Sequence, residues 1–207
     1  MPIEHDAIPN AGLHEPKGVS SAASGTVYVA DGLGSGSWRT SRSGLTGHGF
    51  IDYNDTSTTT TPLAITADTW ITIPNDGAGA FTNKTYAPDG VTELMNVTTG
   101  AIDPTQLSLG DMIFIRNDYT ITPTTNNASL EFRYQLGGGA NIYYLETRLG
   151  RLDSGSGIPY RFSLRVDEIY MGDLNTRDNP IYLQVKCSSA GSLVNAGSVI
   201  SALRYNI

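Results

Sequence analysis

Few residues of this 207-residue chain stand in combinations that catalysis or metal binding requires. Its three histidines, His5, His14 and His48, all lie near the start, so no pair has the spacing of a zinc site. Only His48 could serve a Ser–His–Asp triad in a folded domain, and we interpret it as structural or exposed. The single cysteine, Cys187, excludes an internal disulfide and a multi-thiolate site. Because Cys187 falls on the apolar face of an alternating segment, we expect it to pack as a small hydrophobic residue.

Paired acidic residues are the other candidates for chemistry. Asp52 with Asp55, and Asp167 with Glu168, could hydrolyse a glycosidic bond if the members of a pair met across a cleft. Loop aspartates could also bind calcium, but no D-x-D-x-D-G loop is present. Acidic residues at strand ends are more often simply solvated. We therefore predict no catalytic residue, no metal and no cofactor, and expect a protein that is not an enzyme.

A glycine-rich run, residues 32–37, superficially resembles a phosphate-binding loop. No helical pattern follows it and no Gly-Lys-Ser/Thr ends it, so the helix N-terminus that would hold the phosphate is missing. We interpret it as a flexible or tightly turned segment. The net charge of -7 also argues against nucleic acid, whose phosphates require lysine and arginine.

Membrane and secretion signals are lacking. No basic start leads into an apolar run, and no stretch approaches the roughly 18 apolar residues of a membrane span. We expect a soluble protein made in a cytoplasm, with no nucleic-acid or membrane partner.

Alternating apolar and polar residues predict strands through most of the chain. The best stripes are Leu130–Leu136, Tyr160–Val166 and Ile181–Cys187, each with one buried and one polar face. The apolar runs Met112–Ile115 and Ile142–Leu145 predict strands that are covered on both sides. Weaker strands are expected at Gly49–Tyr53, Leu63–Thr66, Thr69–Ile73, Ala80–Tyr86, Thr92–Val97 and Leu193–Tyr205.

Turn residues separate these segments, and no helical period is found beyond Gly47; Thr56–Thr61 is β-prone or loop-like. About eight to ten short strands without a repeat predict an all-β fold, a jelly-roll sandwich over residues 46–207. Tyr143, Tyr182 and Ile169 fall opposite the core stripes, which modestly favours subunit contacts.

Residues 1–45 differ from the rest, being rich in Gly, Ser, Ala and Pro. They contain one strand-like run, Thr26–Ala30, followed by the turn signal Asp31-Gly32. Alone, such a segment buries too little apolar surface to fold. We therefore predict an extended N-terminal arm that a neighbouring subunit would hold.

Two strings in this arm resemble the N-terminal segments of small structural proteins of tailed bacteriophages. They are His14-Glu15-Pro16-Lys17-Gly18-Val19, and Gly25-Thr26-Val27-Tyr28-Val29-Ala30-Asp31-Gly32 with Gly34-Ser35-Gly36-Ser37-Trp38. The remaining residues resemble, in pattern only, the trimeric jelly rolls of the tumour-necrosis-factor and C1q type that phages use in fibres, spikes and capsid decoration. Leu107–Asp111 looks like the entry to a central strand of that fold.

The resemblance implies a homotrimer of the virion, made in the host cytoplasm, whose arm binds the major capsid protein or another virion protein. The docking residues would be His14, Glu15, Pro16, Lys17, Val27, Tyr28, Val29, Gly34, Gly36 and Trp38. The strand Thr26–Ala30 could add to a neighbour's sheet edge, and Trp38 could be a buried anchor.

Four functions remain open at this point. A capsid decoration protein, that is a cement or head-fibre protein, fits one short arm and one domain best. A receptor-binding tail fibre or spike that recognises host surface glycans is the alternative. A shell protein of a small virus is less favoured because the arm is not basic, and a glycan depolymerase is the least favoured.

Overall fold

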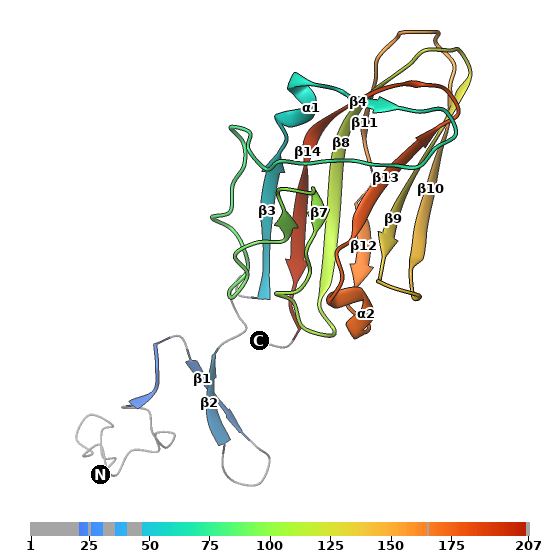
Figure 1. The fold of residues 1–207 in the computed structure, drawn as a ribbon. Helices are drawn as coiled ribbons and strands as arrows, with labels where there is room; N and C mark the ends of the chain where they lie inside the picture. The colour runs from blue at the N-terminus through green and yellow to red at the C-terminus, as the bar shows by residue number, and fades with distance from the viewer. Residues whose placement is uncertain (1–20, 25, 31–35, 41–46, 165, 206–207) are drawn as a thin grey trace, which may run out of the picture. The chain divides into compact units, whose positions relative to one another are not determined.

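The computed structural model describes residues 21–24, 26–30, 36–40, 47–164 and 166–205 (Figure 1). The chain divides into two compact units, Met1–Gly44 and Leu45–Ile207, which are treated separately below. Among the described residues no helix is long and apolar enough to cross a membrane.

The described part of the first unit contains a β-hairpin. Strands β1 (Thr26–Ala30) and β2 (Gly36–Thr40) pair antiparallel, with Tyr28 opposite Trp38. The rings of these two residues meet edge to face, with centroids 5.4 Å apart. The sequence predicted β1 alone; its partner strand is polar except for Trp38, which is why alternation did not reveal it.

In its described residues the second unit consists of strands joined by loops and two single-turn helices. Its elements are β3 (His48–Asn54), α1 (Ser57–Thr60), β4 (Leu63–Ile65), β5 (Ile71–Thr72), β6 (Met95–Asn96), β7 (Ala101–Ile102), β8 (Met112–Pro123), β9 (Ala128–Leu136), β10 (Tyr143–Leu152), β11 (Tyr160–Ser163), β12 (Asp167–Tyr170), α2 (Leu174–Arg177), β13 (Tyr182–Cys187) and β14 (Gly191–Leu203).

The long strands form two antiparallel sheets that pack as a sandwich (Figure 1). One sheet has the order β11-β8-β14-β3, with β12 also on β8 and β4 on β14; the other has the order β10-β9-β13-β5. The chain crosses between the two sheets from β4 to β5, from β8 to β9, from β10 to β11 and on both sides of β13, and of the long strands only β9 and β10 are joined as a hairpin within one sheet. This connectivity is that of a jelly roll, so the predicted fold is confirmed.

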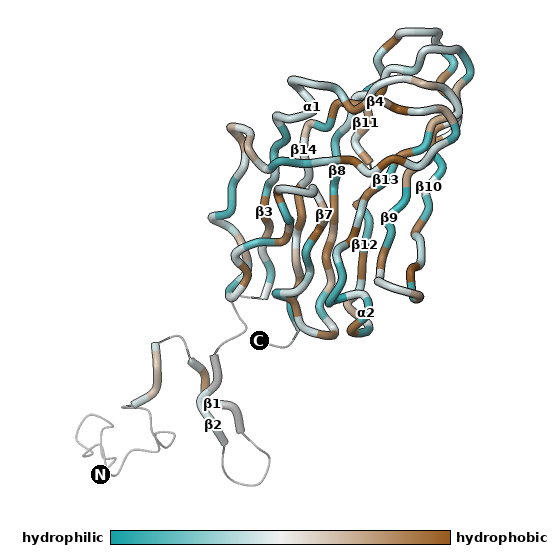
Figure 2. The backbone as a smooth tube through the Cα atoms, in the orientation of Figure 1, coloured by the Kyte–Doolittle hydropathy of each residue, from teal (hydrophilic) through white to brown (hydrophobic). Residues whose placement is uncertain are grey.

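The core lies between the sheets and includes most of the predicted stripes, although Val166, at the end of the stripe Tyr160–Val166, is exposed. Figure 2 shows hydrophobic and hydrophilic residues alternating along the long strands. Ile113, Ile115 and Ile121 of β8 face inward and are fully buried, as are Leu193 and Ile200 of β14. Each such side chain stabilises the fold by roughly 1.5–3 kcal/mol. Leu107–Asp111 does lead into a central strand, because β8 pairs with β14 on one side and with β11 and β12 on the other.

Several local predictions were wrong. Ile169 does not face outward. It lies on β12, opposite Ile113 of β8, and is only 2% exposed. Residues Ala80–Tyr86 form no strand, since only Asn83 makes a β-bridge, to Asp52. The run Thr56–Thr61 contains helix α1, because the Asp55 carboxylate accepts hydrogen bonds from Ser57 Oγ (2.8 Å) and from the Thr58 amide (2.9 Å). Such side-chain bonds favour a local turn over a strand.

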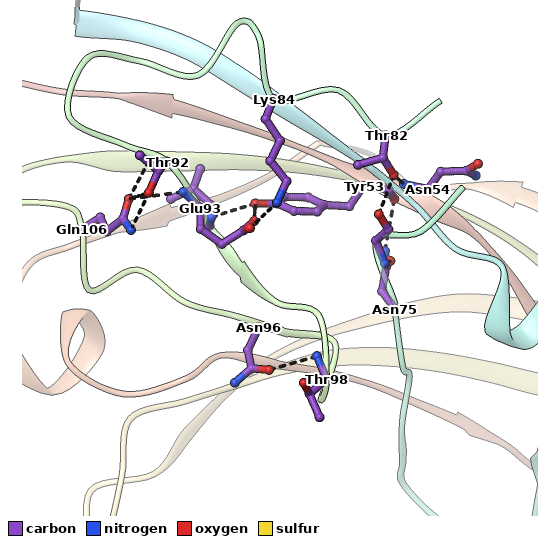
Figure 3. Close-up of polar contacts among 12 residues, drawn as sticks. Tyr53, Asn54, Asn75, Thr82, Lys84, Thr92, Glu93, Asn96, Thr98 and Gln106 are labelled. Carbon is purple, nitrogen blue, oxygen red and sulfur yellow. Dashed lines mark hydrogen bonds and ion pairs between the residues drawn. The ribbon is translucent and has the colours of Figure 1, made fainter. Parts of the chain in front are cut away.

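The connection between β5 and β8 covers the free edge of β3; we call this β3 edge the covered edge. The amide of Phe50 donates to the carbonyl of Tyr86 (2.8 Å), and Asp52 and Asn83 exchange two backbone hydrogen bonds of 2.9 Å. Figure 3 shows the side chains that fix this connection. The fully buried Tyr53 donates its hydroxyl proton to Glu93, which also pairs with Lys84, and the same hydroxyl accepts from the Leu94 amide (2.7 Å).

Candidate functional site

At the opposite side of the sandwich, strand β10 is exposed on both of its faces. Tyr143, Tyr144, Leu145 and Leu149 are each 38–44% exposed, and only Leu152, at its end, is buried. The prediction that Ile142–Leu145 is covered on both sides was therefore wrong. A strand with apolar residues on two uncovered faces is an unusual surface for an isolated soluble domain.

Strand β11 is the end strand of the other sheet. It lies across from β10 and is also incompletely covered. Phe162 of β11 is partly buried, while Ile158 and Val166, which flank this strand, are exposed. The rings of Tyr160 and Phe162 stack with centroids 6.5 Å apart. We call β10 together with β11 and β12 the open edge of the sandwich.

A cavity of about 320 Å³ opens between the sheets at the open edge. Its apolar lining comes from Phe132 of β9, Leu145 and Leu149 of β10, and Phe162 and Leu164. The sandwich is thus unfilled here, so apolar surface of its core remains accessible to solvent.

A buried polar chain leads from the core to this cavity. Ser198 Oγ donates to Asn117 Oδ1 (2.6 Å), and Asn117 Nδ2 donates to the Tyr134 hydroxyl (2.8 Å). Tyr134 in turn hydrogen-bonds the carboxylate of Asp167, which lines the cavity. Burial raises the pKa of Asp167, and the hydrogen bond from Tyr134 opposes that shift. On β8, two residues after Asn117, the Tyr119 hydroxyl is buried without a hydrogen-bond partner in the described part of the chain.

The outer face of the β10-β9-β13-β5 sheet carries an aromatic and ionic cluster. The guanidinium of Arg133 lies between Trp70 and Tyr144, at 4.1 Å and 3.9 Å from the two ring centroids. Arg133 Nε also donates to Gln184 Oε1 (2.7 Å). The ammonium of Lys186 lies 4.7 Å from the Trp70 centroid. We call Trp70, Arg133, Tyr144, Gln184 and Lys186 the aromatic cluster.

Ion pairs tie β10 to β9 on this face. Arg133 pairs with Glu146 (3.6 Å), and Glu131 pairs with Arg148 (3.7 Å) and Lys186 (3.2 Å). Glu146 and Arg148 are well exposed, so each such pair contributes little to folding stability. Their charges remain available to a partner at the open edge.

The predicted docking residues lie only partly in the described chain. Val27 is exposed, Gly36 begins β2, and Tyr28 contacts Trp38 within the hairpin; of Val29 the structure describes the backbone position in β1. The other predicted docking residues, His14, Glu15, Pro16, Lys17 and Gly34, lie outside the described residues. Because β1 already pairs with β2, addition to a neighbour's sheet would have to use an edge of this hairpin other than the one between its two strands.

The acidic pairs are not brought together as glycosidase carboxylates would be. Asp167 faces the cavity, whereas its neighbour Glu168 lies on the opposite face of β12. Asp55 is 2% exposed, and its oxygens accept from Thr58 and from the Asp76 amide (3.0 Å). Asp52 lies instead on the outer face of β3. Its pKa is raised, chiefly by burial and also by the nearby charge of Asp118, while the charge of Arg116 opposes this shift.

Two further residues considered for chemistry also have clear positions. Cys187 is buried in the core as expected, and burial raises the pKa of its thiol. His48 is exposed at the start of β3. Within the described ranges no three His, Cys, Asp or Glu residues are grouped so as to hold a metal ion.

Sequence reasoning missed the open edge, although a signal was present. The run Ile142–Leu145 has apolar residues at neighbouring positions, which predicts burial on both sides. The charged residues Glu146, Arg148 and Arg151 directly after this run are incompatible with a longer strand that is buried on both faces. Together the two features indicate an exposed edge strand.

Comparison with known proteins finds solved structures of low sequence identity. No protein-family model matches the chain, and no curated relative is found. A structure of infectious bursal disease virus, Gt strain, matches with 12% identity and a TM-score of 0.36, covering 85% of this chain and 37% of that one. The VP2 subviral particle of the same virus matches with 14% identity and a TM-score of 0.30, covering 86% and 37%. The chain therefore spans little more than a third of either protein.

Proposed function

We propose that this protein is a structural component of a virus particle, specifically a capsid decoration protein of a tailed bacteriophage. In this proposal residues 1–45 dock on the major capsid protein or another virion protein, and the jelly roll faces outward. The protein would be a homotrimer located in the virion, and it would not act as an enzyme.

The open edge is the observation that carries an assembly function. A ten-residue strand with exposed apolar residues on both faces, beside an unfilled cavity, presents the kind of surface that another chain covers. The phage and docking parts of the proposal rest on the resemblance of the arm. The hairpin offers docking groups of its own, namely the exposed Val27 and the Tyr28–Trp38 ring pair.

Particle binding tests the docking function. Capsids that lack this protein are mixed with the full chain, with a variant lacking residues 1–40, and with Trp38→Ala. Binding is read from co-sedimentation, and folding from circular dichroism. We expect the deletion to abolish binding and leave the jelly roll folded, because the second unit has its own core. Capsid binding by the folded deletion variant would refute docking by the arm.

A second function, receptor binding by a tail fibre or spike, is favoured by the aromatic cluster. Trp70 and Tyr144 supply aromatic rings, while Gln184 and Lys186 supply hydrogen-bond donors and acceptors on the same face. This combination suits a host surface glycan, which presents both C–H faces and hydroxyls.

Host-cell binding separates the two functions. Under the decoration hypothesis the full chain binds capsids but not host cells. The receptor-binding function would be supported instead if the full chain bound host cells, Tyr144→Ala abolished this binding and the matched variant Tyr170→Ala, on the other sheet, retained it. Tyr170 suits this control because it is also exposed but lies outside the aromatic cluster.

A further inference from the structure

The outer side of β10 is a sheet edge without a partner in the described chain. Its inner side pairs with β9 from Tyr143 to Leu152, with a β-bulge at Leu149, but no described residue beyond β9 hydrogen-bonds the β10 backbone. An uncovered edge of this length is a template for an added strand. The residues along it indicate which strand fits.

The middle of β10 reads Leu145-Glu146-Thr147-Arg148-Leu149, which is self-complementary about Thr147. If two copies of this strand pair antiparallel with Thr147 opposite Thr147, each Glu146 faces an Arg148. The Leu145 of one copy then lies near the Leu149 of the other at the ends of this pairing, where a β-bulge at Leu149 interrupts the regular register. Side chains that are directly opposite in an antiparallel pair lie about 4.5–5.5 Å apart at Cβ, so the Glu146–Arg148 pairs are in contact.

The two faces of β10 separate the apolar pairs from the ion pairs. Leu145, Thr147 and Leu149 line the cavity between the sheets, so the leucine pairs would lie on the apolar side. Glu146 and Arg148 lie on the outer face with their β9 partners, so the ion pairs would lie on the solvent side.

Charge also selects this register over its neighbours. A shift by one residue would turn one sheet over and place its leucines in solvent. A two-residue shift in either direction would set Glu146 against Glu146, or Arg148 against Arg148. Like charges directly opposite each other are destabilising.

We infer that the open edge binds a second copy of this chain, through antiparallel pairing of β10 with β10 about a two-fold axis at Thr147. The two four-stranded sheets then form one continuous eight-stranded sheet, and each copy helps to cover the other's cavity. The contact is isologous, and it leaves the other surfaces free for three-fold or particle contacts. It does not depend on the proposed virion function.

Charge-reversal variants of the full chain test the pairing. Glu146→Arg sets an arginine opposite the copy's Arg148, and Arg148→Glu sets a glutamate opposite the copy's Glu146, so each variant should stay monomeric alone. An equimolar mixture restores both attractive pairs and should dimerise at least about tenfold more strongly than either variant alone, as read by sedimentation velocity. A mixture as monomeric as its components would overturn the inference, and so would a wild-type chain that is monomeric throughout.

Cross-linking tests the register independently. Thr147→Cys should form a disulfide between copies, because only position 147 faces itself, whereas Thr98→Cys, at an exposed site away from the edge, reports random collision. The natural Cys187 is 1% exposed and adds no background. We expect Thr147→Cys to cross-link at least about tenfold faster than Thr98→Cys. Equal rates would refute the two-fold register.

Oligomers that survive the charge reversals but vanish when residues 1–40 are deleted would assign the edge to a neighbour's arm instead.

Discussion

The two edges of this sandwich differ in how the chain treats them. At the covered edge, the connection between β5 and β8 hydrogen-bonds β3 and places the buried hydroxyl of Tyr53 against Glu93 and the Leu94 amide. At the open edge, β10 has no comparable cover in the described chain, and its apolar residues reach solvent. The same fold thus closes one edge with its own loop and leaves the other for a partner. Substitutions at the two edges should therefore have unlike effects.

The largest difference is expected between Tyr53→Ala and Leu145→Ala. Tyr53 is fully buried, so its truncation should lower the free energy of unfolding by about 3–5 kcal/mol. Leu145 is already half-exposed, and its truncation should cost less than about 1 kcal/mol in the monomer. Denaturant unfolding at low protein concentration measures both values.

Tyr53→Phe separates the hydroxyl from the ring. It keeps the packing but removes the acceptor of the Leu94 amide, which should cost about 1–3 kcal/mol. Equal losses for Tyr53→Phe and Tyr53→Ala would mean that the polar contacts, not the packed ring, hold the covered edge.

A smaller difference between the edges than that of Tyr53→Ala and Leu145→Ala is expected from a methyl group added at each edge. A Cβ on Gly49 would lie 2.3 Å from the carbonyl oxygen of Tyr86, so Gly49→Ala should push the connection off β3 and cost about 3 kcal/mol. A Cβ on Gly139, in the loop before β10, meets no atom within 4 Å; its φ of +57° leaves only a left-handed penalty of about 1–2 kcal/mol. Thermal unfolding compares the two variants, and a Gly139→Ala loss as large as that of Gly49→Ala would contradict the difference between the edges.

The smallest effect concerns pH at the open edge. Burial raises the pKa of Asp167 above its value of 3.8 in the unfolded chain, so between these two values the folded chain binds more protons. This group therefore destabilises the fold at neutral pH, and the penalty fades as the pH falls through that interval. Asp167→Asn should raise the melting temperature slightly at pH 7, with no gain near pH 4. A gain that is constant across this range would refute the titration of Asp167.

Alternation predicted the core of this fold well, because it reports which face of a strand is buried. The stripes Leu130–Leu136 and Ile181–Cys187 became β9 and β13 in the middle of a sheet. The same signal could not show where long connections lie. Residues 80–86 cover β3 as a hydrogen-bonded loop, and such cover depends on contacts between distant segments.

The candidate site was harder to predict than the fold. Periodicity detects a strand but not its place in the sheet order, so Ile142–Leu145 could not be recognised as an edge from its apolar residues alone. Ile169 was misplaced for a related reason: β12 is a separate short strand, out of phase with the alternation that runs through β11.

Hydrogen exchange of the full chain, measured across a range of protein concentrations, tests the contrast between the edges most directly. The amides of Phe50 and Asp52 on β3 should be protected at every concentration, because the chain itself supplies their acceptors. The β10 amides that point away from β9 should exchange freely in dilute solution and become protected as the concentration rises and copies pair. Protection of those β10 amides that is already complete in dilute solution, or that never changes with concentration, would contradict an edge left open for a second copy.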